Sequence, residues 1–134
     1  SMMLEENKIV DQAQQVMGNL SQKGHMVTTS QIRKFLTAVN TVTEKVNAYK
    51  LEKTDDYDTL PVELQAQIKY LKVKLAYQIG RNRSKWGNPV EDFEKEARLM
   101  SLIDGIKSST KEYEKFAHYI EALVAFHKFY GGKD

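Results

Sequence analysis

Apolar residues recur at the spacing of an α-helix along most of the chain, and this periodicity most constrains the fold. The longest stripe comprises Ile32, Phe35, Leu36, Val39, Val42, Val46 and Tyr49. A second comprises Leu64, Ile68, Leu71, Leu75 and Ile79, at spacings of four, three, four and four. No alternating Val, Ile and Thr run ends in a tight-turn dipeptide, as β-hairpins would require. The chain is therefore predicted to be all-α.

Helix-start signals divide the first half of the sequence. A first amphipathic segment runs from about Leu4 to Met17, and residues 18–26 form a polar connection containing glycine. Thr28 and Gln31 have the spacing of a capping box and open the second helix. Residues 50–59 are charged and turn-like, so we interpret them as a solvated linker.

The second half contains signals for two further helices. Pro61 suits the first turn of a third helix, which is predicted to end near Gly80. A basic loop, residues 81–87, follows. Asn88 as N-cap and Pro89 in the first turn then predict a fourth helix reaching about Lys107.

A fifth helix completes the chain. Ser109 and Glu112 repeat the capping-box spacing, and Gly131 is a natural C-terminal cap. The 134 residues carry no internal repeat and no shift in composition, and their number suits one core rather than two. The prediction is a single domain over residues 1–134, a bundle of about five helices.

The N-terminus and the amino-acid composition bear on location. Ser1 is interpreted as the remnant of an expression tag, so that the native start is Met2 or Met3. No apolar run approaches the roughly 20 residues of a membrane span, and the first residues are acidic instead of basic as in a signal peptide. We expect a cytoplasmic protein without membrane contact. The lack of cysteine excludes disulfides and thiolate chemistry.

Positive charge is concentrated in one stretch, although the net charge is only +2. Between Glu63 and Glu91 the sequence has no acidic residue. The cations of this stretch are Lys69, Lys72, Lys74, Arg81, Arg83 and Lys85. Such a local excess predicts a surface that attracts an anionic polymer.

The third helix is predicted to carry these cations on both sides of its buried face. Tyr70, Lys74, Tyr77 and Arg81 form one flank, and Lys69, Lys72 and Arg83 the other. Long cationic side chains reach phosphates, and tyrosine rings stack on unpaired bases. The alternative is a solvated surface whose tyrosines pack on neighbouring helices, but such a surface usually mixes both signs of charge.

Two further cations, Arg33 and Lys34, lie at the start of the second helix. The helix dipole favours negative charge there, so the position suggests contact with an anionic ligand. Charges against the dipole cost only ~0.3 to 1 kcal/mol at exposed sites, so a plain surface pair remains an equal alternative.

The sequence offers little for catalysis or metal binding. Glu114, His118, Glu121 and His127 share one helix but lack the spacing of a helical metal motif. The acidic residues of segment 55–58 lack the glycine and terminal glutamate of a calcium loop. Phosphate loops, nucleophile elbows and dinucleotide fingerprints are absent from the sequence. We therefore predict no catalytic residue, no metal and no cofactor.

Four segments carry a resemblance to a known family. They are residues 28–34 (T-T-S-Q-I-R-K), 70–73 (Y-L-K-V), 76–81 (A-Y-Q-I-G-R) and 121–134 (E-A-L-V-A-F-H-K-F-Y-G-G-K-D). Together they resemble the small subunit of the Csm complex, the effector of type III-A CRISPR systems. The closing segment is the most specific of the four.

The resemblance implies a non-catalytic subunit that stacks in several copies along a crRNA-guided filament in antiviral defence. Its implied partners are the crRNA, the target RNA, the backbone repeat subunit, the large subunit and further copies of itself. Cleavage of target RNA then belongs to the backbone subunit. DNA cleavage and cyclic oligoadenylate synthesis belong to the large subunit.

The resemblance also ranks the candidate RNA contacts. Arg33, Lys34, Lys72 and Arg81 occupy basic positions of the matching segments. Lys69, Lys74, Arg83 and Lys85 are inferred from charge alone, and Tyr77 from its stacking surface. The rival hypothesis is a helical adapter that binds only protein, through an exposed apolar stripe on the fourth or fifth helix.

Overall fold

The computed structural model describes residues 4–53 and 55–133, and within them the protein is a bundle of six α-helices without a strand. The helices are α1 (Ile9–Gln22), α2 (Thr29–Glu52), α3 (Val62–Arg81), α4 (Pro89–Ala97), α5 (Leu99–Ile106) and α6 (Thr110–Phe129), preceded by the 3-10 helix η1 (Glu6–Lys8). The all-α prediction is confirmed, whereas the predicted count of five helices is wrong. Ser1, Met2 and Met3, to which the tag interpretation refers, lie outside the described residues.

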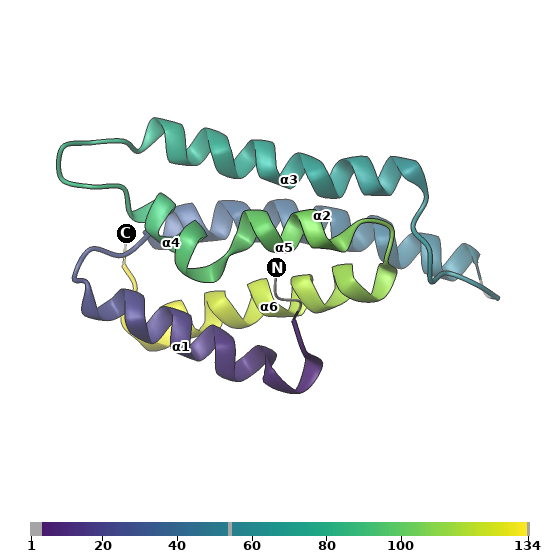
Figure 1. Cartoon of the computed structure of the whole chain (residues 1–134), viewed down its shortest axis with the longest axis horizontal. Helices are drawn as coiled ribbons and strands as arrows, with labels where there is room; N and C mark the ends of the chain where they lie inside the picture. The colour runs from purple at the N-terminus through teal and green to yellow at the C-terminus, as the bar shows by residue number, and fades with distance from the viewer. Residues whose placement is uncertain (1–3, 54, 134) are drawn as a thin grey trace.

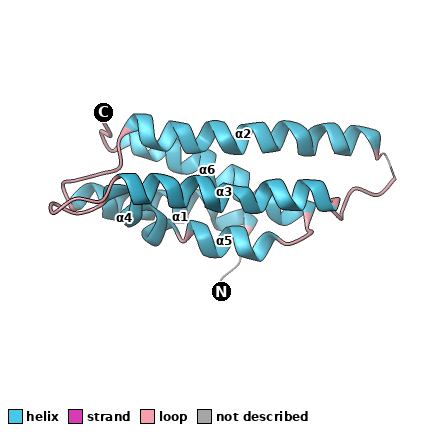
Figure 2. Ribbon diagram, turned by 90° about the horizontal axis from the view of Figure 1, so that it is seen from above, coloured by secondary structure: helices cyan, strands magenta, loops and turns pink. Residues whose placement is uncertain are grey.

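Three long helices, α2, α3 and α6, run along the long axis of the molecule (Figures 1 and 2). Helix α6 packs against α1, α2 and α5, while α3 packs against α2, α4 and α5. In Figure 1, α3 lies at one side of the bundle and α1 at the other. None of the helices in the described part of the chain is both long and apolar enough to span a lipid bilayer.

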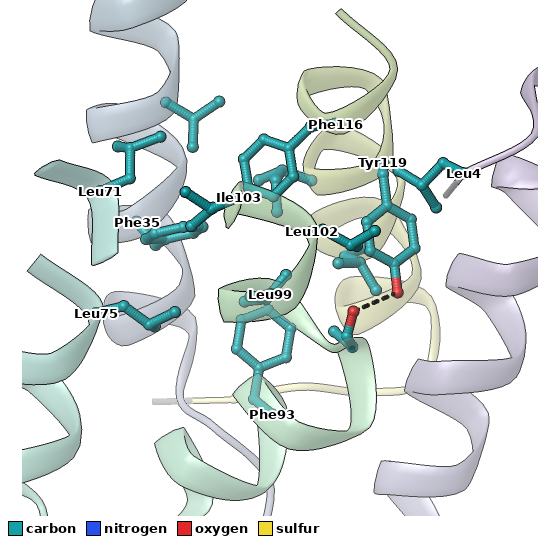
Figure 3. Packing of buried hydrophobic residues seen from close by; sticks show 14 of the residues in the cluster. Leu4, Phe35, Leu71, Leu75, Phe93, Leu99, Leu102, Ile103, Phe116 and Tyr119 are labelled. Atoms are coloured by element: carbon teal, nitrogen blue, oxygen red, sulfur yellow. Dashed lines mark hydrogen bonds between the residues drawn. The ribbon is translucent and has the colours of Figure 1, made fainter. Parts of the chain in front are cut away.

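The core consists of the apolar stripes that the sequence predicts. All five residues of the α3 stripe are buried, as are Ile32, Phe35, Val39, Val42 and Val46 of α2, while Leu36 and Tyr49 are partly buried. Aromatic residues of α6, among them Phe116 and Tyr119, fill the centre (Figure 3). The Tyr119 hydroxyl donates to the Ala97 carbonyl over 3.1 Å, so this buried polar group is satisfied.

The predicted fourth helix is broken at Arg98, which is why the bundle has six helices. Arg98 adopts a left-handed conformation, with φ 57° and ψ 42°, between α4 and α5. Successive helical residues are rotated by about 100°. In one continuous helix, the buried residues of α4 (Val90, Phe93, Ala97) would therefore face away from those of α5 (Leu99, Leu102, Ile103, Ile106). The break lets both sets face the core.

The first helix begins and ends later than predicted. It starts at Ile9 and continues through Gly18, which the sequence placed in a connection. A Cβ atom at Gly18 would lie 3.3 Å from the Tyr130 hydroxyl oxygen, so glycine here allows the C-terminal segment to approach the helix closely. Burial of Leu20 explains why the helix extends beyond this glycine.

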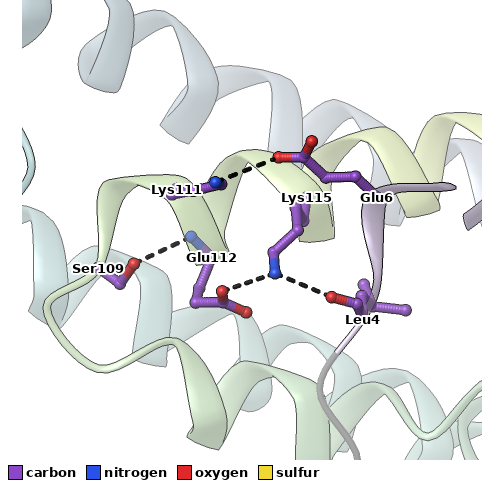
Figure 4. A network of polar contacts seen from close by, with 6 residues as sticks. All are labelled: Leu4, Glu6, Ser109, Lys111, Glu112 and Lys115. Carbon is purple, nitrogen blue, oxygen red and sulfur yellow. Dashed lines mark hydrogen bonds and ion pairs between the residues drawn. The ribbon is translucent and has the colours of Figure 1, made fainter.

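The segment before α1 is fastened to the first turns of α6 (Figure 4). The Lys115 ammonium donates to the Leu4 carbonyl over 2.8 Å and pairs with Glu112 at 2.7 Å. Lys111 and Glu6 form a looser pair at 3.8 Å. Leu4 is thereby held in the core cluster.

Most of the predicted helix boundaries are confirmed. Thr28 and Gln31 form a complete capping box, and Ser109 caps α6. Gly131, with φ 83°, follows the end of α6 as predicted. Pro61 is the N-cap of α3 instead of a first-turn residue, because its extended backbone precedes the helix. Helix α2 extends to Glu52, into the predicted linker.

We predict that Arg98→Gly raises the free energy of unfolding by about 1 kcal/mol, because glycine adopts the left-handed conformation without the Cβ penalty. The same substitution one turn earlier, Lys95→Gly, lies inside α4 and is expected to lower it by ~1 kcal/mol. Urea denaturation of both variants measures the two changes. Destabilisation by Arg98→Gly equal to that by Lys95→Gly would contradict the assignment of the break.

The burial of Tyr113 and Tyr119 predicts that the free energy of unfolding falls at alkaline pH. Burial raises the pKa of Tyr113 and of Tyr119 from 10.0 to about 12. Between these values the unfolded chain has lost the phenolic protons that the folded chain keeps. The contribution of these two tyrosines to the free energy of unfolding should be fully present below pH 10 and be lost as the pH rises toward 12. Unfolding free energies across this range should fall less steeply for Tyr119→Phe than for the wild type.

Candidate nucleic-acid interface

A groove of about 540 Å³ runs between α2 and α3, which lie side by side in Figure 2. Its lining residues are Lys34, Phe35, Thr37, Ala38 and Thr41 of α2, and Tyr70, Val73, Lys74, Tyr77, Gln78 and Arg81 of α3. The fold thus brings Lys34 together with three of the predicted contacts on α3, namely Lys74, Tyr77 and Arg81.

Cations and aromatic rings alternate along the α3 side of this groove. The Lys74 ammonium lies 6.0 Å from the centroid of the Tyr70 ring, and the Arg81 guanidinium 5.9 Å from that of Tyr77. Tyr70 and Tyr77 are 57% and 67% exposed, so their rings are not buried against neighbouring helices. This placement favours the stacking interpretation over the alternative of buried tyrosines.

The groove cations Lys34, Lys74 and Arg81 lack a carboxylate partner among the described residues, unlike several lysines elsewhere in the structure. Lys50 pairs with Glu114 and Lys72 with Asp104, each at 2.7 Å. The hydrogen bond to Glu114 raises the pKa of Lys50. Within the described part of the chain, no carboxylate lies within ion-pair distance of Lys34, Lys74 or Arg81. Their charge is therefore not neutralised by any carboxylate of the described residues.

The remaining predicted residues of the two helices lie outside the groove. Lys72 faces α5, where its pair with Asp104 lies, and Lys69 is exposed on α3. Arg33 is exposed on α2 and, unlike Lys34, does not line the groove. The second flank predicted for α3 thus retains Lys69 and Lys72, but its third member, Arg83, lies in the loop after the helix, because α3 ends at Arg81. Only the flank that faces α2 forms a groove.

The positive surface continues beyond the groove to one end of the bundle. A depression of about 240 Å³ is lined by Lys34 and Arg81, and a pocket of about 730 Å³ by Arg81, Arg83, His25 and Lys133. Arg81 lines all three hollows. No Asp or Glu is among the described residues that line them. An anionic chain in the groove could therefore continue past Arg81 without meeting a carboxylate of the described lining residues.

Comparison with known proteins identifies the family. Residues 4–133 match the family model Csm2 Type III-A, which covers nearly the whole chain. The chain belongs to the Csm2 family. This family is the small subunit of the type III-A Csm complex, so the resemblance drawn from the four sequence segments is confirmed.

Three Csm2 relatives illustrate the breadth of the similarity, and each is described as "CRISPR system Cms protein Csm2". The chain is 33% identical to that of Streptococcus thermophilus, over 98% of both chains. It is 32% identical to that of Enterococcus italicus, over 92% of this chain and 84% of the relative. It is 29% identical to that of Mycobacterium tuberculosis (strain CDC 1551 / Oshkosh), over 96% of both chains.

The histidines of α6 do not form a metal site with the neighbouring glutamates. His118 is exposed, whereas His127 is buried with its Nε2 atom 2.7 Å from the Val27 carbonyl oxygen. His127 thus joins α6 to the segment before α2. Over residues 4–53 and 55–133, no group of three or more His, Asp or Glu side chains is placed to hold a metal ion.

Sequence reasoning missed Trp86, the one tryptophan of the chain. It lies in the loop between α3 and α4, next to Lys85, and is 76% exposed. Its indole ring lies 5.1 Å from the Lys85 ammonium. The available signal was a lone aromatic residue inside an acid-free basic segment.

Asn88 anchors the end of this loop. Its side-chain amide donates to the Ile79 carbonyl over 2.8 Å, and its carbonyl oxygen accepts from the Glu91 amide over 3.1 Å. One residue therefore caps α4 and joins it to the last turns of α3. At the same end, Gln31 donates to Asn82 over 2.8 Å and joins α2 to α3.

We predict that Asn88→Ala lowers the free energy of unfolding by about 2 kcal/mol, because it removes a helix cap and the donor to a buried carbonyl. Ser109→Ala is the matched control, since the Ser109 side chain makes only the capping bond to Glu112 among the described residues, and we expect a loss of ~1 kcal/mol. Chemical denaturation gives both values. Equal losses would show that the bond to Ile79 contributes nothing measurable.

Proposed function

We propose that this protein is a non-catalytic RNA-binding subunit of a type III-A CRISPR ribonucleoprotein. In this proposal, guide and target RNA bind through their backbone along the groove between α2 and α3. The observation that carries it is the row of unpaired cations and exposed tyrosines in that groove, with no carboxylate among its described lining residues. Lys34, Lys74 and Arg81 would contact phosphates, and Tyr70 and Tyr77 would stack on unpaired bases.

The chemistry of the groove favours binding without sequence preference. Lysine and arginine side chains recognise phosphates, which are the same at every nucleotide. Tyrosine rings stack on any base, since each base has a π face. The exposed cations outside the groove, Arg33, Lys69, Arg83 and Lys85, would add contacts to strands that extend beyond it.

The proposed partners are the crRNA, the target RNA and other Csm subunits. The latter are the backbone repeat subunit, the large subunit and further copies of this chain, stacked along a filament that acts in antiviral defence in the cytoplasm. Membership of the Csm2 family supports this assembly. The lack of a nucleophile or metal motif in the sequence supports a role without catalysis.

The rival hypothesis, an adapter that binds only protein, has less support. It requires an exposed apolar stripe on α4, α5 or α6. Among the described residues, the large exposed apolar side chains include none on α4 or α5 and only Phe129 on α6. Helix α3 instead exposes Val62, Tyr70, Val73 and Tyr77, three of which line the basic groove.

The test replaces the groove cations Lys34, Lys74 and Arg81 by glutamine in one variant. Removing up to three phosphate contacts should weaken RNA binding and reduce the salt slope, log Kd against log salt, by about 2 for single strands. Fluorescence anisotropy of two unrelated RNAs of ~30 nucleotides, at low and moderate salt, measures both quantities. The two RNAs should be affected equally.

A control variant loses the same charge elsewhere. Lys8, Lys95 and Lys111 lie on η1, α4 and α6, and each pairs with a glutamate. Replacing them by glutamine should change RNA affinity much less than the groove substitutions do. If both variants weakened RNA binding equally, the loss of affinity would be explained by net charge and not by the groove. If the groove variant weakened the binding of only one of the two RNAs, recognition through the backbone would be contradicted.

A further inference from the structure

The turn that carries Trp86 has a defined conformation. The Ser84 hydroxyl accepts from the Trp86 amide over 3.1 Å and lies 3.0 Å from the Gly87 carbonyl oxygen, to which it donates. The Gly87 amide donates back to the Ser84 carbonyl over 3.2 Å. Gly87 has φ +115°, a value that glycine adopts far more readily than other residues. The short loop is thus closed by three hydrogen bonds.

This turn directs a large aromatic surface outward. Trp86 is 76% exposed, more than either groove tyrosine. The turn is joined to the bundle by Asn88, whose bond to the Ile79 carbonyl fixes the start of α4. Since the hydrogen bonds of the turn do not involve the indole, the side chain is not needed to hold it closed.

The positive charge around Trp86 indicates which class of ligand would bind to its exposed indole ring. Arg81, Arg83 and Lys85 precede it closely in the sequence, and the segment 64–90 has no acidic residue. The Lys85 ammonium lies 5.1 Å from the indole centroid. An aromatic ring among cations, in the loop that follows the groove residue Arg81, matches a single-stranded nucleic acid, with its phosphates and unstacked bases.

We propose that Trp86 stacks on an unpaired base of RNA that leaves the groove past Arg81 and Arg83. This inference rests on the proposed RNA-binding function and adds a preference for unpaired over duplex RNA. Bases inside a duplex are already stacked on their neighbours and offer no free face to an indole. Lys34, Lys74 and Arg81 hold the phosphates of either form, whereas Trp86 adds to the groove tyrosines a further contact that only an unpaired base can make.

The chain itself supplies the probe, because Trp86 is its only tryptophan. Tryptophan emission, excited where tyrosine does not absorb, is followed while unstructured single-stranded RNA is added to the wild-type protein. The same protein is titrated with duplex RNA of equal length. Anisotropy of labelled RNA in parallel samples reports binding independently of the indole.

Stacking predicts strong quenching of the emission by single-stranded RNA and little quenching by the duplex at equal saturation. Trp86→Ala should weaken binding of single-stranded RNA by roughly 5- to 150-fold and leave the salt slope unchanged, because no phosphate contact is lost. Trp86→Phe should retain most of the affinity. Thermal unfolding of both variants should match the wild type, since the side chain is exposed.

Failure of this inference is distinguishable from failure of the proposed function. Binding in the anisotropy assay without a change in tryptophan emission would overturn stacking and leave the groove proposal standing. Equal quenching by both RNA forms would overturn the preference for unpaired RNA. Absence of any RNA binding would overturn the proposed function and this inference with it. An emission change only upon addition of other Csm subunits would assign the indole to a protein contact.

Discussion

Burial of the apolar face of α3 is the constraint on which the candidate interface depends. Leu64, Ile68, Leu71, Leu75 and Ile79 are buried in the core cluster, and α3 packs against α2, α4 and α5. Each of these apolar side chains contributes roughly 1.5 to 3 kcal/mol on full burial, so rotation of the helix about its axis would be costly. The fixed rotation places Tyr70, Lys74, Tyr77 and Arg81 along the junction with α2. The groove is therefore a consequence of core packing.

One end of the bundle links the groove to the rest of the positive surface. The Thr29 amide donates to the Lys133 carbonyl over 3.1 Å, and His127 contacts the Val27 carbonyl. A Cβ atom at Gly132 would lie 2.1 Å from the His127 ring, so only glycine fits at this position. The C-terminal segment is thereby held beside the start of α2. Its position brings Lys133 into the pocket that Arg81 and Arg83 also line.

The sequence predicts what depends on local pattern and fails where packing decides. The α2 and α3 stripes and the caps at Thr28, Asn88 and Ser109 could be read directly, because period and capping chemistry are local. The break at Arg98 was not predicted, because the residue in the left-handed conformation is not glycine. The sequence did contain a signal, since the apolar residues before and after Arg98 would lie on opposite faces of one helix. The meeting of Lys34 with the cations of α3 requires the pairing of α2 with α3, which no single-helix pattern contains.

Lys72 and Lys74 illustrate how two neighbouring cations of one helix can differ in availability. Lys72 pairs with Asp104 at 2.7 Å, whereas Lys74 lines the groove without a carboxylate partner among the described residues. An exposed ion pair contributes only about 0 to 1 kcal/mol, so a phosphate could displace Asp104 at little cost. Asp104 would still repel an approaching phosphate. Under the proposed RNA-binding function, RNA therefore enters on the α2 side of α3 and engages Lys72 only where a strand extends over α5.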